Sequence, residues 1–393
     1  MIIHGNAFLK NMVLVAEGHP LHLQICDARI RNHKLEALAH QLTPLPEDIE
    51  NTIEGSEHDP IYLSAAWRDG FSLITDPGRE DKETLAEWLA SAQSGGFRYN
   101  TVLPDTHPVP DNGDMIRGFV TKPIFNAHPV QMIGALTRDN KGTQLAELRD
   151  MMQQGCKVFS HGFRPAISAQ MMRNALEYLQ GTDACILVIP FDGPLTANGQ
   201  MHEGAFSVQT GLKGIPTIAE TAVIHRDCAL ALKTGTHVHF TGISSAESVR
   251  MIYDAKQKGA PVSASVFATH LFYTDQALLN FNTHLKLMPP LRSESDRYAL
   301  IQGLLEGIID GIVSGHSPST PEEKKVEFPA ASFGSATMAE TFSLAWRALV
   351  HTKKMQPAQL IRFFTQGIPM ITGSASKSLA LQDTVSVWYD RKK

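Results

Sequence analysis

The sequence predicts an α/β fold, a (β/α)8 TIM barrel in which eight parallel strands alternate with helices. In the middle of the chain, apolar or β-branched runs of about five residues alternate with amphipathic stretches of about 12 to 18 residues. Strands separated by helices imply right-handed crossovers and a parallel sheet. Eight strands over about 280 residues fit a barrel, which takes roughly 250 residues. No strand is followed by a glycine-rich phosphate-binding motif, which argues against a doubly wound nucleotide-binding sheet.

The predicted barrel elements follow one another in a regular order. The strands are residues 71–75, 99–103, 130–134, 156–160, 185–189, 237–241, 262–266 and 312–314. The helices between them are residues 81–92, 144–154, 168–179, 218–233, 245–258 and 294–305. The helix at 245–258 has the clearest boundaries, because Ser244 and Ser245 supply an N-cap and Gly259 supplies a stop signal.

The two ends of the chain differ from the middle. Residues 1–4, 7–10 and 21–26 alternate between apolar and polar side chains, and residues 379–389 do the same, which is typical of half-exposed strands. Residues 33–41 instead show a helical pattern. We therefore predict a small β-sandwich domain built from residues 1–66 plus 367–393, beside a barrel domain of residues 67–366.

Composition excludes several classes of protein. The chain carries 35 basic and 40 acidic residues, a net charge of −5, and no basic run, which argues against nucleic acid as a partner. The longest apolar run, residues 184–191, is far too short to cross a bilayer. The four cysteines form no closely spaced pair, so we expect reduced thiols, a cytoplasmic location and no membrane partner.

Short motifs recur at the ends of the predicted strands and in the loops after them. They are Asp76-Pro77-Gly78-Arg79-Glu80-Asp81, Gly95-Gly96-Phe97, Leu103-Pro104-Asp105-Thr106, Met201-His202-Glu203-Gly204, Met288-Pro289-Pro290-Leu291-Arg292 and His316-Ser317-Pro318-Ser319. In order and spacing, from about residue 65 to about residue 340, these blocks resemble a dihydroorotase of the amidohydrolase superfamily. The resemblance implies a TIM barrel of the amidohydrolase type with a small β domain, and a place in pyrimidine biosynthesis.

The positions that the resemblance assigns to metal ligands carry few donor atoms. In the family the first strand ends in an Asp-x-His-x-His-x-Arg pattern, and here the two histidine positions are Phe71 and Leu73. The remaining ligand positions correspond to His161, in a stretch without an acid, and to Ile189, Gly242 and Gly315. Apolar side chains and glycine have no lone pair for a cation, so we expect no zinc cofactor and no catalytic residue of the family reaction.

The resemblance also identifies a vestigial substrate pocket. Its residues are Thr75, Asp105, Met288 and His316. Thr75 replaces the arginine that would bind the substrate carboxylate, and Asp105 adds a negative charge, so we expect dihydroorotate to be repelled. Arg292 and His316 do match the family pattern.

The leading prediction is a catalytically inactive dihydroorotase homologue that acts as a structural or regulatory partner of aspartate carbamoyltransferase, a partner that the resemblance implies. A homodimer is expected. Two alternatives remain open. One is an amidohydrolase acting on cyclic amides through a displaced or different metal site, for which the candidate ligands are His161, His237, His239, His270 and His316. The other is a module that binds a metabolite in the vacated pocket without converting it.

Overall fold

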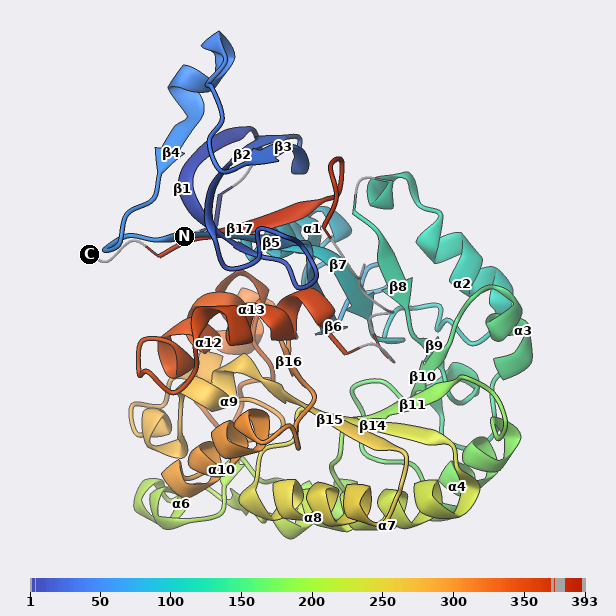
Figure 1. Ribbon diagram of the computed structural model, residues 1–393. Coiled ribbons are helices and arrows are strands. Elements are labelled where there is room, and N and C mark those ends of the chain that lie inside the picture. The colour runs from blue at the N-terminus through green and yellow to red at the C-terminus, as the bar shows by residue number, and fades with distance from the viewer. Residues whose placement is uncertain (1, 4, 127, 369–370, 372–378, 391–393) are drawn as a thin grey trace.

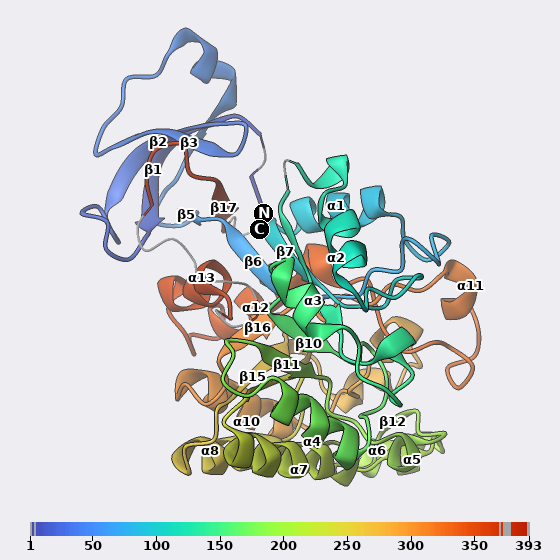
Figure 2. The same ribbon diagram turned by 90° about the vertical axis from the view of Figure 1, so that its right-hand side faces the viewer.

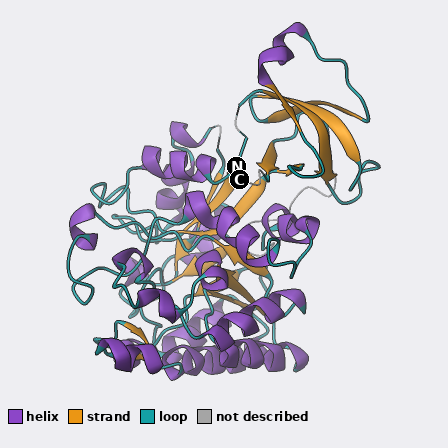
Figure 3. Cartoon of the chain, turned by 90° about the vertical axis from the view of Figure 1, so that its left-hand side faces the viewer, coloured by secondary structure: helices purple, strands orange, loops and turns teal. Residues whose placement is uncertain are grey.

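A computed structural model describes the whole chain except residues 1, 4, 127, 369–370, 372–378 and 391–393. A sheet made from both ends of the chain lies beside a barrel (Figure 1). The barrel strands occupy its centre and the helices surround them (Figure 3). Within the described part of the chain, none of the helices has the length and apolar character that crossing a membrane requires.

All eight predicted barrel strands are present, although the first lies at residues 67–72 instead of 71–75 and the third is divided into two short pieces. The strands are β6 (Trp67–Ser72), β7 (Phe97–Val102), β8 (Val130–Met132), β9 (Gly134–Ala135), β10 (Val158–Ser160), β11 (Cys185–Val188), β14 (His237–Thr241), β15 (Val262–Phe267) and β16 (Gly311–Val313). They pair in parallel, in the orders β6-β7-β8 and β9-β10-β11-β14-β15-β16. The chain itself joins the two sheets between β8 and β9.

The helices cover the outside of the barrel and its loops. The α-helices are α1 (Leu85–Ser94), α2 (Gly113–Val120), α3 (Leu148–Gln153), α4 (Ala169–Tyr178), α5 (Gly193–Thr196), α6 (Ala205–Thr210), α7 (Ile218–Thr234), α8 (Ala246–Gln257), α9 (Ala268–Phe272), α10 (Glu294–Leu305), α11 (Pro321–Lys324), α12 (Thr341–Leu349) and α13 (Pro357–Gln366). Short 3₁₀ turns are η1 (Pro46–Asn51), η2 (Pro123–Phe125), η3 (Arg138–Asn140), η4 (Asp275–Leu278), η5 (Thr283–Leu285) and η6 (Met338–Glu340), and β12 (Met201–His202) pairs with β13 (Gly214–Ile215). The predicted N-cap at Ser245 is confirmed, since its side chain accepts from the Ser248 N–H.

A buried carboxylate completes the barrel between its first and last strands. Asp69 on β6 is fully buried and accepts hydrogen bonds from the Ser314 N–H (2.9 Å), the Ser314 hydroxyl (2.6 Å) and the Ser72 hydroxyl (3.1 Å). The only backbone pairing between these strand ends that the described residues record is the bridge from Ser72 to His316. The side chain of Asp69 therefore holds β6 against the end of β16, where the regular ladder is short.

The chain termini form one six-stranded sheet. Its strands are β1 (Ala7–Val15), β2 (Ile25–Arg31), β3 (Lys34–Ala39), β4 (Thr52–Glu54), β5 (Ile61–Ala65) and β17 (Val385–Tyr389). Their order is β17-β5-β1-β2-β3, with β4 also paired to β1. The helical prediction for residues 33–41 is wrong, because the segment pairs with β2 over Asp27–Arg31 as an antiparallel hairpin. Tertiary pairing outweighs the local pattern there.

An aromatic cluster attaches this sheet to the barrel. The rings of Trp67 at the start of β6 and Phe342 on α12 stack with their centroids 3.8 Å apart. The ring centroid of Trp388 on β17 lies 5.0 Å from that of Phe342 and 5.5 Å from that of Trp346. Figure 2 shows that α6 and α11, in the loops after β11 and β16, lie on the side of the barrel away from the terminal sheet. The carboxyl ends of the barrel strands therefore face away from the place where the terminal sheet is attached.

Candidate functional site

The carboxyl ends of the barrel strands surround an apolar centre. In a (β/α)8 enzyme these ends carry the chemistry. Here Phe71, Leu73 and Ile189 are 0%, 7% and 3% exposed and belong to one hydrophobic cluster with Phe267 and Met288. The rings of Phe71 and Phe267 have their centroids 5.0 Å apart. Three positions that the resemblance assigns to metal ligands thus contribute to packing.

Two further ligand positions are glycines that lie against the same aromatic ring. Gly242 follows β14 and Gly315 follows β16, and Phe267 ends the strand between them. Both glycines have left-handed φ angles, +72° and +65°. A Cβ atom added to either would lie 2.6 Å from a carbon of the Phe267 ring. The ring therefore occupies the space into which side chains at 242 and 315 would project.

The remaining position, His161 after β10, lies beside a partly buried ion pair. Its Nδ1 atom is 3.3 Å from the Thr137 hydroxyl, and burial, with a smaller effect of Arg164, lowers its pKa to about 4. Asp105, whose side chain is 8% exposed, accepts from the Arg164 guanidinium and from the Phe163 N–H (3.1 Å). Burial raises the pKa of Asp105, although Arg164 acts in the opposite direction. Sequence reasoning treated Asp105 as an uncompensated charge and missed this arginine.

The other residues of the predicted vestigial pocket point to different neighbours. The Thr75 hydroxyl donates to the Arg79 carbonyl in its own loop (3.0 Å). His316 is fully buried and donates through Nε2 to Glu83 (2.8 Å), an acid in the loop after β6 that sequence reasoning did not pair with it. Met288 lines what remains of the barrel mouth, a cavity of about 10 Å³. A single water needs about 10–15 Å³, so this space holds one water at most.

The histidines considered for a displaced metal site contact protein groups: two of them share one serine hydroxyl, and the others lie elsewhere. His237 and His239 both contact the Ser263 hydroxyl at 2.8 Å, as strand alternation predicts for rings on one face, and His239 also contacts Ser265. His270 donates through Nε2 to the Pro289 carbonyl (3.1 Å). Burial lowers the pKa of His239 to about 3 and that of His270 to about 4. Over the described residues, no three His, Cys, Asp or Glu side chains converge to hold a metal ion.

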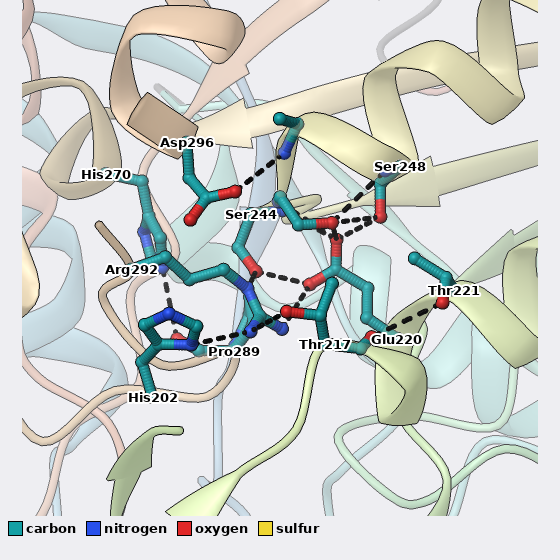
Figure 4. A network of polar contacts seen from close by, with 12 residues as sticks. His202, Thr217, Glu220, Thr221, Ser244, Ser248, His270, Pro289, Arg292 and Asp296 are labelled. Carbon is teal, nitrogen blue, oxygen red and sulfur yellow. Dashed lines mark hydrogen bonds and ion pairs between the residues drawn. The ribbon is translucent and has the colours of Figure 1, made fainter. Parts of the chain in front are cut away.

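A buried ion pair anchors the loop after β15 to the helices around it (Figure 4). The side chains of Arg292 and Glu220 are each 2% exposed, and Nη2 of Arg292 lies 3.1 Å from Oε2 of Glu220. Arg292 also donates through Nε to the Ser244 hydroxyl at 2.6 Å. Ser248 donates to Glu220 at 2.5 Å, and the Arg292 guanidinium lies 3.2 Å from Nδ1 of His202. Burial opposes ionisation of Glu220, yet Arg292 and the donors outweigh it and lower its pKa. Because its donors and acceptors are mutually satisfied, this network fixes the loop instead of presenting reactive groups.

The residues at the mouth do not fit the zinc centre that the resemblance implies. Zinc takes nitrogen, sulfur or oxygen donors at about 2.0–2.3 Å, three or four of them around one point. Phe71, Leu73 and Ile189 offer carbon, and Gly242 and Gly315 face an aromatic ring. We therefore derive no hydrolytic step through a metal-bound water.

Comparisons with known proteins agree with the resemblance. A family model described as "Dihydro-orotase-like" matches residues 71–248. The dihydroorotase of Pelotomaculum thermopropionicum is 40% identical over 288 residues, 73% of this chain and 67% of that protein. The dihydroorotase of Desulforapulum autotrophicum is 36% identical over 346 residues, 85% of this chain and 81% of that protein.

Solved structures match the fold over nearly the whole chain. An L-hydantoinase (dihydropyrimidinase) from Arthrobacter aurescens superposes with a TM-score of 0.77 at 16% identity, covering 97% of this chain and 86% of that one. A dihydropyrimidinase from Brevibacillus agri gives a TM-score of 0.73 at 16% identity, covering 96% of this chain and 84% of that one. At such identities the likeness shows the amidohydrolase TIM-barrel fold alone.

Proposed function

The chain belongs to the dihydroorotase family. We propose that it is a dihydroorotase homologue in pyrimidine biosynthesis that lacks dihydroorotase activity. We propose further that it serves as a structural or regulatory partner of aspartate carbamoyltransferase. The proposal includes a homodimer in the cytoplasm, with no zinc cofactor. The four cysteines are all buried and free, which suits a reducing compartment.

One observation carries the proposal of inactivity. Phe71, Leu73 and Ile189, at positions that the family resemblance assigns to metal ligands, lie together in a closed hydrophobic cluster. Dihydroorotase chemistry needs a metal to bring the pKa of a bound water towards roughly 7. A hydrocarbon cluster supplies no donors for the metal that would activate that water.

The partner part of the proposal rests on the family resemblance, and the intact scaffold is consistent with it. The barrel is closed at Asp69, its loops are anchored through Arg292, and the terminal sheet is attached through Trp67. A fold can keep its outer surfaces while its site changes, because site and scaffold are separate features. An intact scaffold is what a role in assembly requires, and this is the support that the fold gives to the proposal.

Activity and metal content should be measured on one sample of the purified full chain. We expect less than one tenth of an equivalent of zinc by elemental analysis, and no dihydroorotate hydrolysis above the buffer rate. The dihydroorotase of Pelotomaculum thermopropionicum, prepared in parallel, is the positive control. Stoichiometric zinc together with turnover contradicts the proposal.

Assembly is tested by mixing the chain with aspartate carbamoyltransferase from the same cell. We expect the two to co-elute in size-exclusion chromatography with light scattering, and the chain alone to elute as a dimer. Transcarbamoylase activity is then compared with and without the chain. Separate elution together with unchanged transcarbamoylase activity contradicts the partner role.

Neither alternative is favoured by a specific observation. A displaced metal site would bring at least three candidate ligands together, whereas His237 and His239 meet only at the Ser263 hydroxyl and His270 and His316 have other hydrogen-bond partners. A metabolite-binding module would need a pocket, whereas the mouth cavity next to Met288 measures about 10 Å³.

A further inference from the structure

We infer that Phe267 is the residue that closes the barrel mouth, and that it excludes side chains at positions 242 and 315 by occupying their space. The identification of 242 and 315 as former ligand positions rests on the proposed function. The steric relationship among the three residues does not depend on that identification. The inference assigns Phe267, at a position that is not one of the family ligand positions, the role of blocking the ancestral site.

The two glycines contact opposite ends of the Phe267 ring. A Cβ on Gly242 would lie 2.6 Å from Cζ and 2.9 Å from Cε1, at the far end of the ring. A Cβ on Gly315 would lie 2.6 Å from Cγ and 2.7 Å from Cδ2, at the near end. Carbon atoms in ordinary contact are about 3.5–4.0 Å apart, so neither position accepts even a methyl group while the ring stays in place.

The ring has little freedom to move aside. Phe267 is 3% exposed, and the centroids of Phe71 and His270 lie 5.0 Å and 5.7 Å from its own. His270 is held by its hydrogen bond to the Pro289 carbonyl. The mouth beyond, lined by Phe163 and Met288 among others, leaves about 10 Å³. This cavity is far too small to receive a displaced phenyl ring.

This arrangement makes the residue at position 267 and the residues at positions 242 and 315 dependent on one another. A histidine at 242 or an aspartate at 315 is larger than the methyl group that already clashes with Phe267. Neither can return to its family position while the phenyl ring is present. Conversely, if Phe267 is replaced by a smaller residue while positions 242 and 315 remain glycine, an unfilled cavity is left, which lowers the free energy of unfolding. Glycine, phenylalanine and glycine on three neighbouring strands thus form one packing unit.

The test is a set of double-mutant cycles read by thermal unfolding of the full chain. Gly235 is the matched control, because it has the same φ of +72° as Gly242 and nothing within 4 Å of its added Cβ. We expect Gly235→Ala to lower Tm by about 2 °C, the effect of left-handed backbone alone. Gly242→Ala and Gly315→Ala should each lower Tm by at least about twice that amount.

The second variant of each cycle is Phe267→Leu, which removes the far end of the ring and keeps the near end. In this background the decrease in Tm caused by Gly242→Ala should become as small as that caused by Gly235→Ala. The decrease caused by Gly315→Ala should stay unchanged. Phe267→Ala should relieve both positions. General weakening of the core would not produce this selectivity, because it would affect the two glycine positions alike.

Additive effects of Gly242→Ala and Phe267→Leu would overturn the inference, as would additive effects of both glycine variants with Phe267→Ala, or equal Tm shifts for Gly235→Ala and Gly242→Ala. The outcomes are distinct from those that test the proposed function. Zinc or turnover in the unmodified chain would contradict inactivity, whereas the coupling of Phe267 to Gly242 and Gly315 is measured without metal or substrate.

Discussion

Lowering the pH from 7.5 to 5.5 should remove a large part of the free energy of unfolding, because four buried histidines stay neutral in the folded protein. They are His128, His202, His239 and His270, which are 1%, 9%, 0% and 3% exposed. Burial lowers the pKa of His128, His202 and His270 to about 4 and that of His239 to about 3. An unfolded histidine has a pKa of about 6.5.

The sign follows from these lowered values. The stabilisation is fully present above pH 6.5 and is lost as the pH falls, because the unfolded chain then binds protons that the folded protein excludes. At pH 5.5 each histidine contributes a loss of between about 1 and 2 kcal/mol, or about 5 kcal/mol for the four. His161, whose pKa is also lowered to about 4, adds to this loss. Burial raises the pKa of Asp69 to about 6, and protonation of that carboxyl in the folded protein returns about 1 kcal/mol. The expected net loss is at least about 4 kcal/mol, against a total stability of about 5–15 kcal/mol.

The assay is urea unfolding at pH 7.5, 6.5 and 5.5, followed by fluorescence of the buried tryptophans Trp67, Trp88 and Trp346. His239→Asn should reduce the pH dependence by about 1 kcal/mol, since it removes one of the histidines whose pKa burial lowers. His58→Asn, at an exposed position, should leave it unchanged. A free energy of unfolding that agrees within about 1 kcal/mol at pH 7.5 and 5.5 would refute the reasoning.

Three further variants test the packing of the scaffold by chemical denaturation. Arg292→Met leaves Glu220 buried without its cation and should cost about 3–5 kcal/mol, part of which the additional change Glu220→Gln should recover; a loss below about 1 kcal/mol would contradict the buried ion pair. Asp69→Ala removes the acceptor of the buried Ser314 N–H and should cost about 1–3 kcal/mol, so an unchanged midpoint would contradict its role in closing the barrel. Phe342→Ala should cost about 3–5 kcal/mol and shift the tryptophan emission to longer wavelength, and an unaltered spectrum would argue against its stack on Trp67.

The barrel strands were predictable because buried parallel strands appear in a sequence as short β-branched runs. The eight runs correspond to β6–β11 and β14–β16, and the pattern at residues 294–305 coincides with α10. The pattern at 33–41 misled, because Leu35 and Leu38 are spaced like one helix face while the segment pairs with β2. Helices α2, α5, α6, α9, α11, α12 and α13 were not predicted.

The candidate site was predictable only in part. Resemblance identified the ligand positions, and the apolar character of Phe71 and Leu73 is visible in the sequence. The partners Glu83 for His316 and Arg164 for Asp105 lie 233 and 59 residues away along the chain, and no local pattern links them.

The role of Phe267 depends on the register of three strands, so it was not found either. A signal did exist. Residues 242, 267 and 315 lie at the carboxyl ends of three adjacent strands, and they are a glycine, a phenylalanine and a glycine. Aligning predicted strand ends across the barrel would have exposed this complementarity.

The absence of a metal site at the strand ends is tested most directly by anomalous diffraction at the zinc edge, on crystals grown with excess zinc. We expect no anomalous peak within reach of the ends of β6, β11, β14 and β16. A peak there, held by nitrogen or oxygen atoms at bonding distance, would contradict the account.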